Sequence, residues 1–272
     1  MLGLMQAEPE SRRFGHVDGA LWAGLYLGLT TAHLAPLAWL MLVPRGPRER
    51  LGRMLALQPF ARYSNWFAGL RPEIVGAEHL PMADKGNLYV ANHESALDIP
   101  LLLGAVARPF VMKDSLRPTP FGWGATYAGS VSVHRDSAES RERACEQAIE
   151  TARRYASMIV FSEGTFGHRD GRLRAPQLGL LMRAHETGLG IVPLGHAGTR
   201  RALDGDRPPF RRGVRVALVA RPPLRARDHA DPESFARAAW TEVVAAVREA
   251  RALVGPGAPY EADPGADWDA GG

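Results

Sequence analysis

The longest apolar segment of the chain lies near its N-terminus, where residues 19–44 contain no formally charged side chain. As an α-helix this segment would be about 39 Å long, enough to cross a hydrocarbon core of about 30 Å. His33 and Pro36 near its middle are unfavourable in lipid. A single anchor, a re-entrant helix and a long buried helix of a soluble protein all fit this pattern. Three aromatic side chains lie toward its ends, as interfacial residues do: Trp22, Tyr26 and Trp39.

A cluster of four arginines follows this segment at once: Arg45, Arg48, Arg50 and Arg53. By the positive-inside rule, the cluster places that flank and everything after it on the cytoplasmic side of the cell membrane. The run is too long, and begins too far into the chain, for a cleaved signal peptide. Residues 48–70 mix arginines with large apolar side chains, which suits either the headgroup layer or packing against a domain. We therefore expect a polar N-terminus (1–18), then a membrane anchor with an amphipathic helical segment (19–70).

Between residues 71 and 254, short apolar runs alternate with helical stretches. The runs predict strands at 73–75, 88–91, 109–112, 131–133, 158–161, 191–194 and 214–219. Helical patterns cover 97–106, 137–155, 179–187 and 232–253, the last with Asp231 as N-cap and Pro232 at its first position. This alternation predicts an α/β fold, a single domain with a largely parallel mixed sheet flanked by helices. Residues 255–272 are rich in Gly, Pro, Ala and Asp, so we expect a disordered acidic tail there.

Composition adds compartment and charge to this picture. Cys145 is the only cysteine, which excludes an intramolecular disulfide and a multi-cysteine zinc site and fits a reducing compartment. The formal net charge is +4, but the tail beyond Gly255 carries four acidic residues and no Lys or Arg, so the body is more basic than that. Most of the basic charge is arginine, which favours phosphate or carboxylate ligands, an anionic membrane surface, or nucleic acid. Composition does not choose among these partners.

The strand predicted at 88–91 leads into Asn92 and His93, and Asp98 follows five positions after His93. On an ideal helix five positions rotate by about 140°, so both side chains cannot face one way if the segment is helical throughout. We therefore expect His93 on the loop and Asp98 in the first helical turn, reaching back to it. Such a pair is the minimum apparatus for taking a proton from a hydroxyl. The alternative is a capping histidine beside a solvated aspartate. Ser95 is a candidate helix cap and a less favoured candidate for a nucleophile.

Other polar residues follow other predicted strands, and ligand groups gather at the carboxyl ends of parallel strands. Lys113 and Arg135 follow two of them, where they either converge on an anionic group or stand as solvated charges. Glu163-Gly164-Thr165 follows a third and offers a carboxylate, close backbone access and a hydroxyl, or forms a simple turn. The apolar stretch Ile191–Leu194 either lines an acyl-chain pocket or forms a buried strand.

Motifs of several other protein classes are missing from the sequence. It contains no Gly-x-Ser-x-Gly elbow, which counts against a serine hydrolase. It contains no Gly-x-Gly-x-x-Gly after a strand and no P-loop, so nucleotide-cofactor and kinase functions lack support. The sequence has no recognisable nucleic-acid-binding motif, and nucleic-acid binding would not explain the apolar segment 19–44.

Four blocks, in order and covering roughly residues 70–220, resemble the motifs of one family. Asn92-His93 with Asp98 is similar to NHxxxxD, and Phe161–Thr165 to FPEGT. Ile191–Leu194 is similar to the apolar block IVPV. Between them, the second block is matched by Lys113-Asp114-Ser115-Leu116, Pro120-Phe121-Gly122-Trp123, Gly129 and Arg135. With these blocks the chain resembles the glycerolipid and lysophospholipid acyltransferase family, most closely the bacterial 1-acylglycerol-3-phosphate acyltransferases.

This resemblance implies acyl transfer from an acyl-CoA or acyl-ACP (acyl carrier protein) thioester to the hydroxyl of a lysolipid, most simply 1-acylglycerol-3-phosphate. His93 would be the general base and Asp98 would orient it, without a covalent acyl-enzyme, a metal or a bound cofactor. The residues implied in substrate binding are Asn92, Lys113, Ser115, Arg135, Glu163, Gly164 and Thr165. Those implied in the acyl-chain or donor pocket are Ile191, Val192, Pro193 and Leu194. A non-catalytic lipid-binding protein on the same fold is the rival, and intact His93 and Asp98 argue against it.

The third block departs from the family where a phosphate would bind. In family members that form phosphatidic acid this block continues as EGTR, whereas this chain has Phe166 in place of the arginine. Gln177 stands where a lysine is common. A lost bidentate arginine–phosphate contact costs a few kcal/mol of binding. An acceptor without a phosphomonoester, such as a lyso-ornithine lipid, therefore stays open. Three nearby cations are candidates to substitute: Arg169, Arg172 and Arg174.

Overall fold

The computed structural model describes residues 12–13, 16–80, 85–206 and 210–269. Five strands form its central sheet, in the spatial order β2–β9–β7–β3–β6. They are β2 (Pro72–Val75), β9 (Val216–Ala220), β7 (Gly190–Ala197), β3 (Asn87–Ala91) and β6 (Met158–Phe161). Neighbours pair in parallel except β7 and β9, which are antiparallel. This confirms the predicted mixed and largely parallel sheet.

Two short strands extend this arrangement beyond β6. β4 (Val111–Lys113) and β5 (Val131–Val133) pair in parallel, and a bridge between Phe110 and Ile159 connects them to β6. All seven predicted strands are therefore present. β7 is longer than predicted and reaches Ala197, so its end lies at the same edge of the sheet as the ends of β3 and β6.

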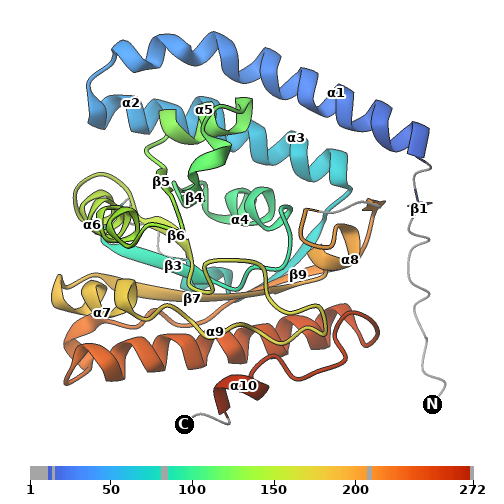
Figure 1. The fold of residues 1–272 in the computed structure, drawn as a ribbon. Helices are drawn as coiled ribbons and strands as arrows, with labels where there is room; N and C mark the ends of the chain where they lie inside the picture. Colours follow the sequence, from blue (N-terminus) through green and yellow to red (C-terminus); the bar gives the residue numbers. More distant parts are fainter. Residues whose placement is uncertain (1–11, 14–15, 81–84, 207–209, 270–272) are drawn as a thin grey trace.

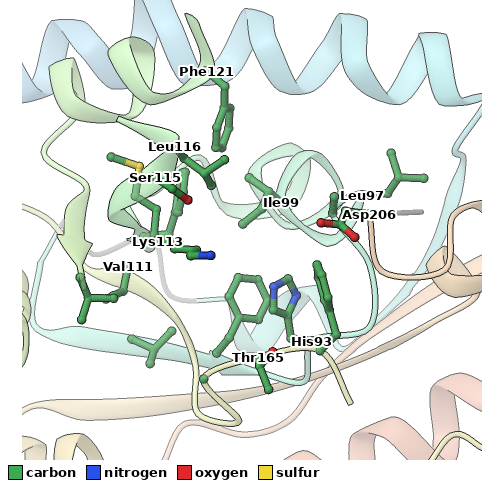
Figure 2. A pocket seen from close by; sticks show the side chains of 18 of the residues that line it. His93, Leu97, Ile99, Val111, Lys113, Ser115, Leu116, Phe121, Thr165 and Asp206 are labelled. Atoms are coloured by element: carbon green, nitrogen blue, oxygen red, sulfur yellow. The ribbon is translucent and has the colours of Figure 1, made fainter. Parts of the chain in front are cut away.

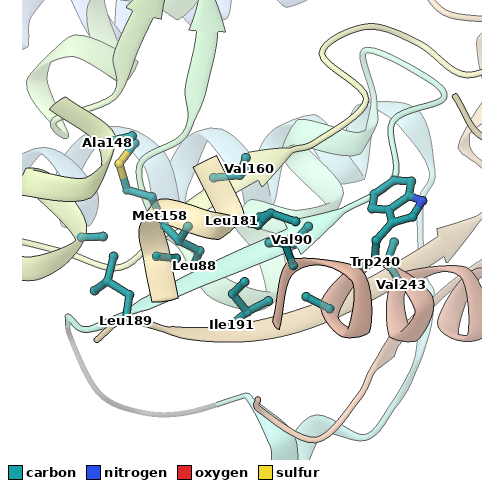
Figure 3. Packing of buried hydrophobic residues seen from close by; sticks show 14 of the residues in the cluster. Leu88, Val90, Ala148, Met158, Val160, Leu181, Leu189, Ile191, Trp240 and Val243 are labelled. Carbon is teal, nitrogen blue, oxygen red and sulfur yellow. The ribbon is translucent and has the colours of Figure 1, made fainter. Parts of the chain in front are cut away.

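The apolar runs are continuous because both faces of the sheet are covered, as is usual for parallel strands. In β3, Leu88 and Val90 point into one hydrophobic cluster, whereas Tyr89 and Ala91 point into another. Figure 3 shows the first cluster, where Leu88 lies near Met158 and Leu181, and Val90 lies on the side of Trp240. Helices on opposite faces thus enclose the strands that carry the site.

The helices of the body are α4 (Asp98–Val106), α5 (Pro120–Tyr127), α6 (Ala138–Arg154), α7 (Gly179–Glu186), α8 (Thr199–Ala202) and α9 (Pro232–Val254). α9 has the predicted cap, because Oδ1 of Asp231 accepts a hydrogen bond from Ser234 N at 2.8 Å. α5 was not predicted, since its two glycines hide the helical pattern. A Cβ at Gly122 would lie 2.0 Å from the Leu116 carbonyl oxygen, so close packing requires a glycine there.

The N-terminal helices lie together over one face of the body (Figure 1). They are α1 (His16–Leu34), a 3₁₀ helix (Ala35–Leu42), α2 (Arg45–Gly52), a π-helical turn (Arg53–Leu57) and α3 (Gln58–Ala68). Pro36 explains the change from α to 3₁₀ geometry, because it has no N–H to continue the α-helical hydrogen bonds. The predicted polar N-terminus, 1–18, falls mostly outside the described residues.

Residues 21–42 are long and apolar enough to cross a membrane, yet they pack on α3 along one side. Tyr26 donates to or accepts from Ser64 at 2.9 Å, and Trp22 stacks edge-on against Phe67 with ring centroids 5.3 Å apart. Nε2 of His33 lies 2.7 Å from the Leu55 carbonyl oxygen, which satisfies its polar group. The other side of the segment is exposed. Its large apolar side chains there include Leu21, Leu25, Leu27, Leu29, Trp39, Met41 and Leu42.

The prediction of a disordered tail is wrong for residues 255–269, which pack against the body and end in α10 (Ala266–Asp269). Arg248 pairs with Asp263 at 2.7 Å, and Arg251 donates to the Ala262 carbonyl at 3.0 Å. Trp268 packs against the cluster around α9. The composition of the tail suggested disorder because the arginines that hold it lie elsewhere in the sequence.

Candidate active site

The loop after β3 is organised by the first residue of α4, Asp98. Its Oδ2 accepts hydrogen bonds from the backbone N–H groups of Glu94 at 2.7 Å and Ser95 at 2.9 Å. The same oxygen lies 2.8 Å from Nδ1 of His93. His93 therefore lies on the loop and Asp98 at the start of the helix, as the spacing predicted. Ser95 is fully buried and its Oγ accepts a hydrogen bond from Leu97 N, which is the role of a cap.

Asp98 is fully buried and is held as a carboxylate by its partners. Burial alone would raise its pKa, but the charge of His196 and the hydrogen bond from His93 lower the pKa below the usual value. The Thr199 hydroxyl donates to its Oδ1 at 2.5 Å. Because the carboxylate faces Nδ1, that nitrogen of His93 carries the proton as a donor. Nε2 is then the atom with a free lone pair.

The imidazole of His93 contacts two phenyl rings, one stacked on it and one tilted against it. Its centroid is 4.1 Å from that of Phe161, nearly parallel, and 4.4 Å from that of Phe166. These contacts and the Asp98 hydrogen bond together fix the ring orientation at the wall of a large cavity.

This cavity has a volume of about 1300 Å³ and lies between the sheet edge and the N-terminal helices. Figure 2 shows His93 and Thr165 on one wall, with Lys113 and Ser115 opposite and Asp206 at another side. The part of its lining that comes from α1 and α3, called here the apolar arm, includes Trp22, Tyr26 and Phe60. The part that comes from α6 and α7, called here the charged arm, includes Arg141, Glu142, Cys145 and Arg183.

Six of the residues expected at the site line this cavity: His93, Lys113, Ser115, Arg135, Gly164 and Thr165. Two others hold the backbone instead. The Asn92 amide exchanges hydrogen bonds with the backbone of His196, at 3.1 and 2.9 Å, and is buried. Glu163 accepts hydrogen bonds from His93 N at 2.8 Å and Arg174 N at 2.7 Å. Burial raises the pKa of Glu163 to about 7.

The expectation that Ile191, Val192, Pro193 and Leu194 form an acyl-chain or donor pocket is wrong. These residues are buried in β7, between β3 and β9, and do not line the cavity. Ile191 packs in one core, and Val192 and Leu194 in the other. A central strand with both faces covered leaves no side for a ligand.

Lysine and arginine side chains line the cavity, but they are not the three arginines that were expected to replace the family's missing cations. Arg169 and Arg172 pair with Asp204 and Asp170, and Arg174 donates to the Phe166 carbonyl. None of these three lines the cavity. Among the residues that the structure describes, the cations that line it are Lys113, Arg135, Arg141 and Arg183, the last paired with Glu142.

His196 and Thr199, which contact Asp98, were not predicted. Both follow the rule that pointed to His93, because they lie at or just beyond the end of β7 at the same sheet edge. The apolar run at 191–194 hid them, since the strand extends three residues past it. Tyr260 also reaches this region, and no local pattern in the tail indicates that.

An α/β fold with a buried aspartate holding a histidine at the wall of a large, largely apolar cavity defines a candidate general-base site for a lipid-sized substrate. A sequence model described as Acyltransferase matches residues 71–197, the part that carries this site. Together with the relatives below, this shows that the chain belongs to the acyltransferase family.

Among the relatives, the lyso-ornithine lipid O-acyltransferase of Pseudomonas aeruginosa is 31% identical over 193 residues, covering 68% of this chain and 70% of the relative. A chloroplastic 1-acyl-sn-glycerol-3-phosphate acyltransferase of Brassica napus is 33% identical over 135 residues, covering 49% of this chain and 39% of its own length. The chain thus spans well under two thirds of the plant relatives it matches.

The fold is also that of a solved structure. The crystal structure of the 1-acyl-sn-glycerophosphate (LPA) acyltransferase from Thermotoga maritima matches with a TM-score of 0.71 at 24% identity. The match covers 89% of this chain and 98% of that one, so it includes the N-terminal helices as well as the α/β body.

Proposed function

We propose that this protein transfers an acyl group from an acyl thioester to the free hydroxyl of a lysolipid, with His93 as general base and Asp98 as its orienting partner. The observation that carries the proposal is the 2.8 Å contact between Nδ1 of His93 and Oδ2 of Asp98, beside the cavity. It leaves Nε2 as the only ring atom that can accept a proton. The family and the 1-acylglycerol-3-phosphate acyltransferases among the relatives support the same reaction.

The proposed reaction needs one proton acceptor, which later becomes a donor. Nε2 of His93 takes the proton of the acceptor hydroxyl as its oxygen attacks the thioester carbonyl carbon. The imidazolium that forms is stabilised by the buried Asp98 carboxylate, which stays ionised. When the tetrahedral intermediate collapses, the C–S bond breaks and the thiolate takes the proton from Nε2. The acyl ester and the free thiol leave, and His93 is neutral again.

For the acceptor, we propose 1-acylglycerol-3-phosphate, giving phosphatidic acid. Lys113 and Arg135 follow the parallel strands β4 and β5 and both line the cavity, so their charges are available to a phosphate. Gly164, with φ of +67°, brings backbone close to the same cavity.

A second candidate acceptor is a lysolipid without a phosphomonoester, such as a lyso-ornithine lipid. Phe166 rather than a cation lies against His93, and the cavity also carries the Asp206 carboxylate. Charges of both signs suit a headgroup that has both an ammonium and a carboxylate. The lyso-ornithine lipid O-acyltransferase is also a relative matched over more than two thirds of both chains.

The proposed donor is an acyl-CoA or acyl-ACP thioester, a co-substrate rather than a bound cofactor. The charged arm of the cavity, with Arg141 and Arg183, suits the anionic carrier, and the apolar arm suits an acyl chain. No role for nucleic acid follows from these features.

We also propose that the protein works at the cytoplasmic face of the cell membrane. Residues 21–42 expose apolar side chains on one side, and helices of the same N-terminal segment line the apolar arm of the cavity. A lysolipid could then enter from the membrane without crossing water. Arg45 and Arg53 contribute less to the membrane surface than the sequence suggested, because Arg45 pairs with Glu49 and Arg53 is buried.

One assay tests the reaction and the acceptor together. Purified protein is offered 1-acylglycerol-3-phosphate and lyso-ornithine lipid, each with acyl-CoA and with acyl-ACP. His93→Ala and Asp98→Asn are expected to lower the rate by about 10³-fold or more, while folding and vesicle binding stay intact. Near-normal transfer by His93→Ala would refute the mechanism. Binding of lysolipid without transfer by the unaltered protein would favour a non-catalytic lipid-binding protein instead.

A further inference from the structure

A second acid–base pair, His196 and Glu94, lies buried next to Asp98 and outside the cavity lining. Nε2 of His196 is 3.6 Å from Oδ2 of Asp98 and donates to the Asn92 carbonyl at 2.9 Å. Nδ1 of His196 is 3.6 Å from Oε1 of Glu94. Both side chains are buried, and neither lines the cavity, so this pair does not touch substrate.

The surroundings of His196 favour its protonated form. Its Nδ1 has no hydrogen-bond partner among the described residues and faces the Glu94 carboxylate. A bare lone pair would be repelled there, whereas an N–H is attracted. Burial lowers the pKa of His196, but the Asp98 and Glu94 charges outweigh it and raise the pKa to about 9. The other charged groups around this cluster are His93, Glu163, Arg200 and Arg251.

The tail supplies the residue that closes this cluster. The Tyr260 hydroxyl lies 2.9 and 3.0 Å from the two Glu94 carboxylate oxygens and accepts a hydrogen bond from Gly198 N. Its ring lies under the guanidinium groups of Arg251, at 4.6 Å, and Arg201, at 5.1 Å. A phenol held at both ends in this way fixes the Glu94 carboxylate beside His196.

We propose that Glu94, His196 and Tyr260 are positioning residues for the His93–Asp98 pair. The His196 cation lies next to the Asp98 carboxylate, which orients His93. Glu94 stabilises that cation, and the Tyr260 hydroxyl holds the Glu94 carboxylate in place. The inference rests on the proposed function, since it requires His93 to act as a general base. Its chemical consequence is that the His196 cation balances part of the Asp98 charge, while Asp98 keeps its hydrogen bond from Nδ1 of His93.

The first test separates positioning by Tyr260 from simple attachment of the tail. Tyr260→Phe keeps the ring in contact with Arg201 and Arg251 and removes only the hydroxyl. The matched control is Arg248→Gln, which breaks the 2.7 Å ion pair with Asp263 in the same tail without touching Glu94. Tyr260→Phe is expected to lower kcat about tenfold with KM unchanged, and Arg248→Gln to keep the kcat of the unaltered enzyme. Equal kcat values for the two variants, per folded molecule, would overturn the role of Tyr260.

The second test reads the charge on His196. In enzyme labelled with ¹⁵N in histidine, both ring nitrogens of His196, assigned by their loss in His196→Gln, are expected to be protonated at pH 7. In Glu94→Gln, His196 loses its second carboxylate and becomes neutral more easily. Because the His196 cation is then less firmly held beside Asp98, kcat is expected to fall about tenfold with KM unchanged. A neutral His196 at pH 7 in the unaltered enzyme would refute the inference.

Failure of the proposed function gives a different result. An enzyme that transfers no acyl group to any acceptor leaves the kinetic tests without a signal, but the ¹⁵N spectra still report the charge of His196. An active enzyme whose His196 is neutral keeps the proposed function and loses this inference.

Discussion

The phenyl ring of Phe166 lies against the imidazole of His93, with ring centroids 4.4 Å apart and planes inclined by 50°. The residue after the FSEGT block is therefore in direct contact with the proposed base. In the proposed reaction, the side chain at this position would lie close to the hydroxyl that His93 deprotonates. We therefore expect this position to influence the choice between the two proposed acceptors.

Phe166→Arg is expected to raise kcat/KM for 1-acylglycerol-3-phosphate relative to lyso-ornithine lipid by about tenfold. The reason is that a guanidinium beside the cavity can bind a phosphomonoester through two hydrogen bonds. The measurement is steady-state kinetics with the two acceptors in separate assays. Phe166→Leu is the control for lost ring volume without added charge. A ratio that changes equally in both variants would show that space, not charge, sets the preference.

Glu163→Gln is expected to lower the free energy of unfolding by about 1–3 kcal/mol and to reduce the rate of transfer. The Glu163 carboxylate accepts both His93 N and Arg174 N, and an amide has only one acceptor oxygen. Denaturant unfolding at pH 6, below the pKa of about 7, measures the change, because at that pH the variant does not also remove a buried charge. The control is Glu150→Gln, which loses an exposed ion pair with Arg154 and should cost a few tenths of a kcal/mol. Similar losses in the two variants would contradict the bridging role of Glu163.

The stability of the protein is expected to fall as the pH rises from about 6.5 to 9. The folded state raises the pKa of His196 to about 9, above the unfolded value near 6.5, so it binds that proton more tightly. The resulting stabilisation is fully present below pH 6.5 and is lost as the pH rises through 9. It amounts to about 3 kcal/mol at most. Unfolding of the unaltered protein and His196→Gln from pH 6 to 10 measures it; parallel curves would mean that His196 contributes nothing.

Leu25→Glu combined with Leu42→Glu is expected to weaken binding to anionic vesicles more than tenfold. The two leucines are 54% and 89% exposed, and each contributes about 1.5–3 kcal/mol when a leucine side chain leaves water. A sedimentation assay with vesicles gives the partition coefficient. Ile74→Glu is the control, because Ile74 is 41% exposed on β2, away from the N-terminal helices. Equal binding by the double variant and the control would place the membrane contact elsewhere.

Where the sequence predicted well, neighbouring residues carried the signal. The step from β3 to α4 was readable because a buried strand, a histidine and a helix start follow one another directly. The helix α9 was readable from Asp231, Pro232 and a long periodic pattern. In both cases hydrogen bonds within a few residues determine the local structure.

Where the prediction failed, the deciding contacts join distant parts of the chain. Ile191–Leu194 resembles a lining block, but its position between β3 and β9 places it in the core. The tail resembles a disordered segment, but Arg248 and Arg251 hold it in place. Asn92 resembles a substrate-binding residue, but β7 engages both ends of its amide.

The sequence alone determined the α/β class, the family and the His93–Asp98 pair, because periodicity, capping and short motifs are local properties. Tertiary structure decided that Phe166 lies against His93, that Glu163 and Asn92 support the loop, and that Tyr260 reaches Glu94 from 166 residues away. These contacts depend on how strands and helices pack in three dimensions. Burial and charge at the site depend on the same packing, so they could only be read once the chain was folded.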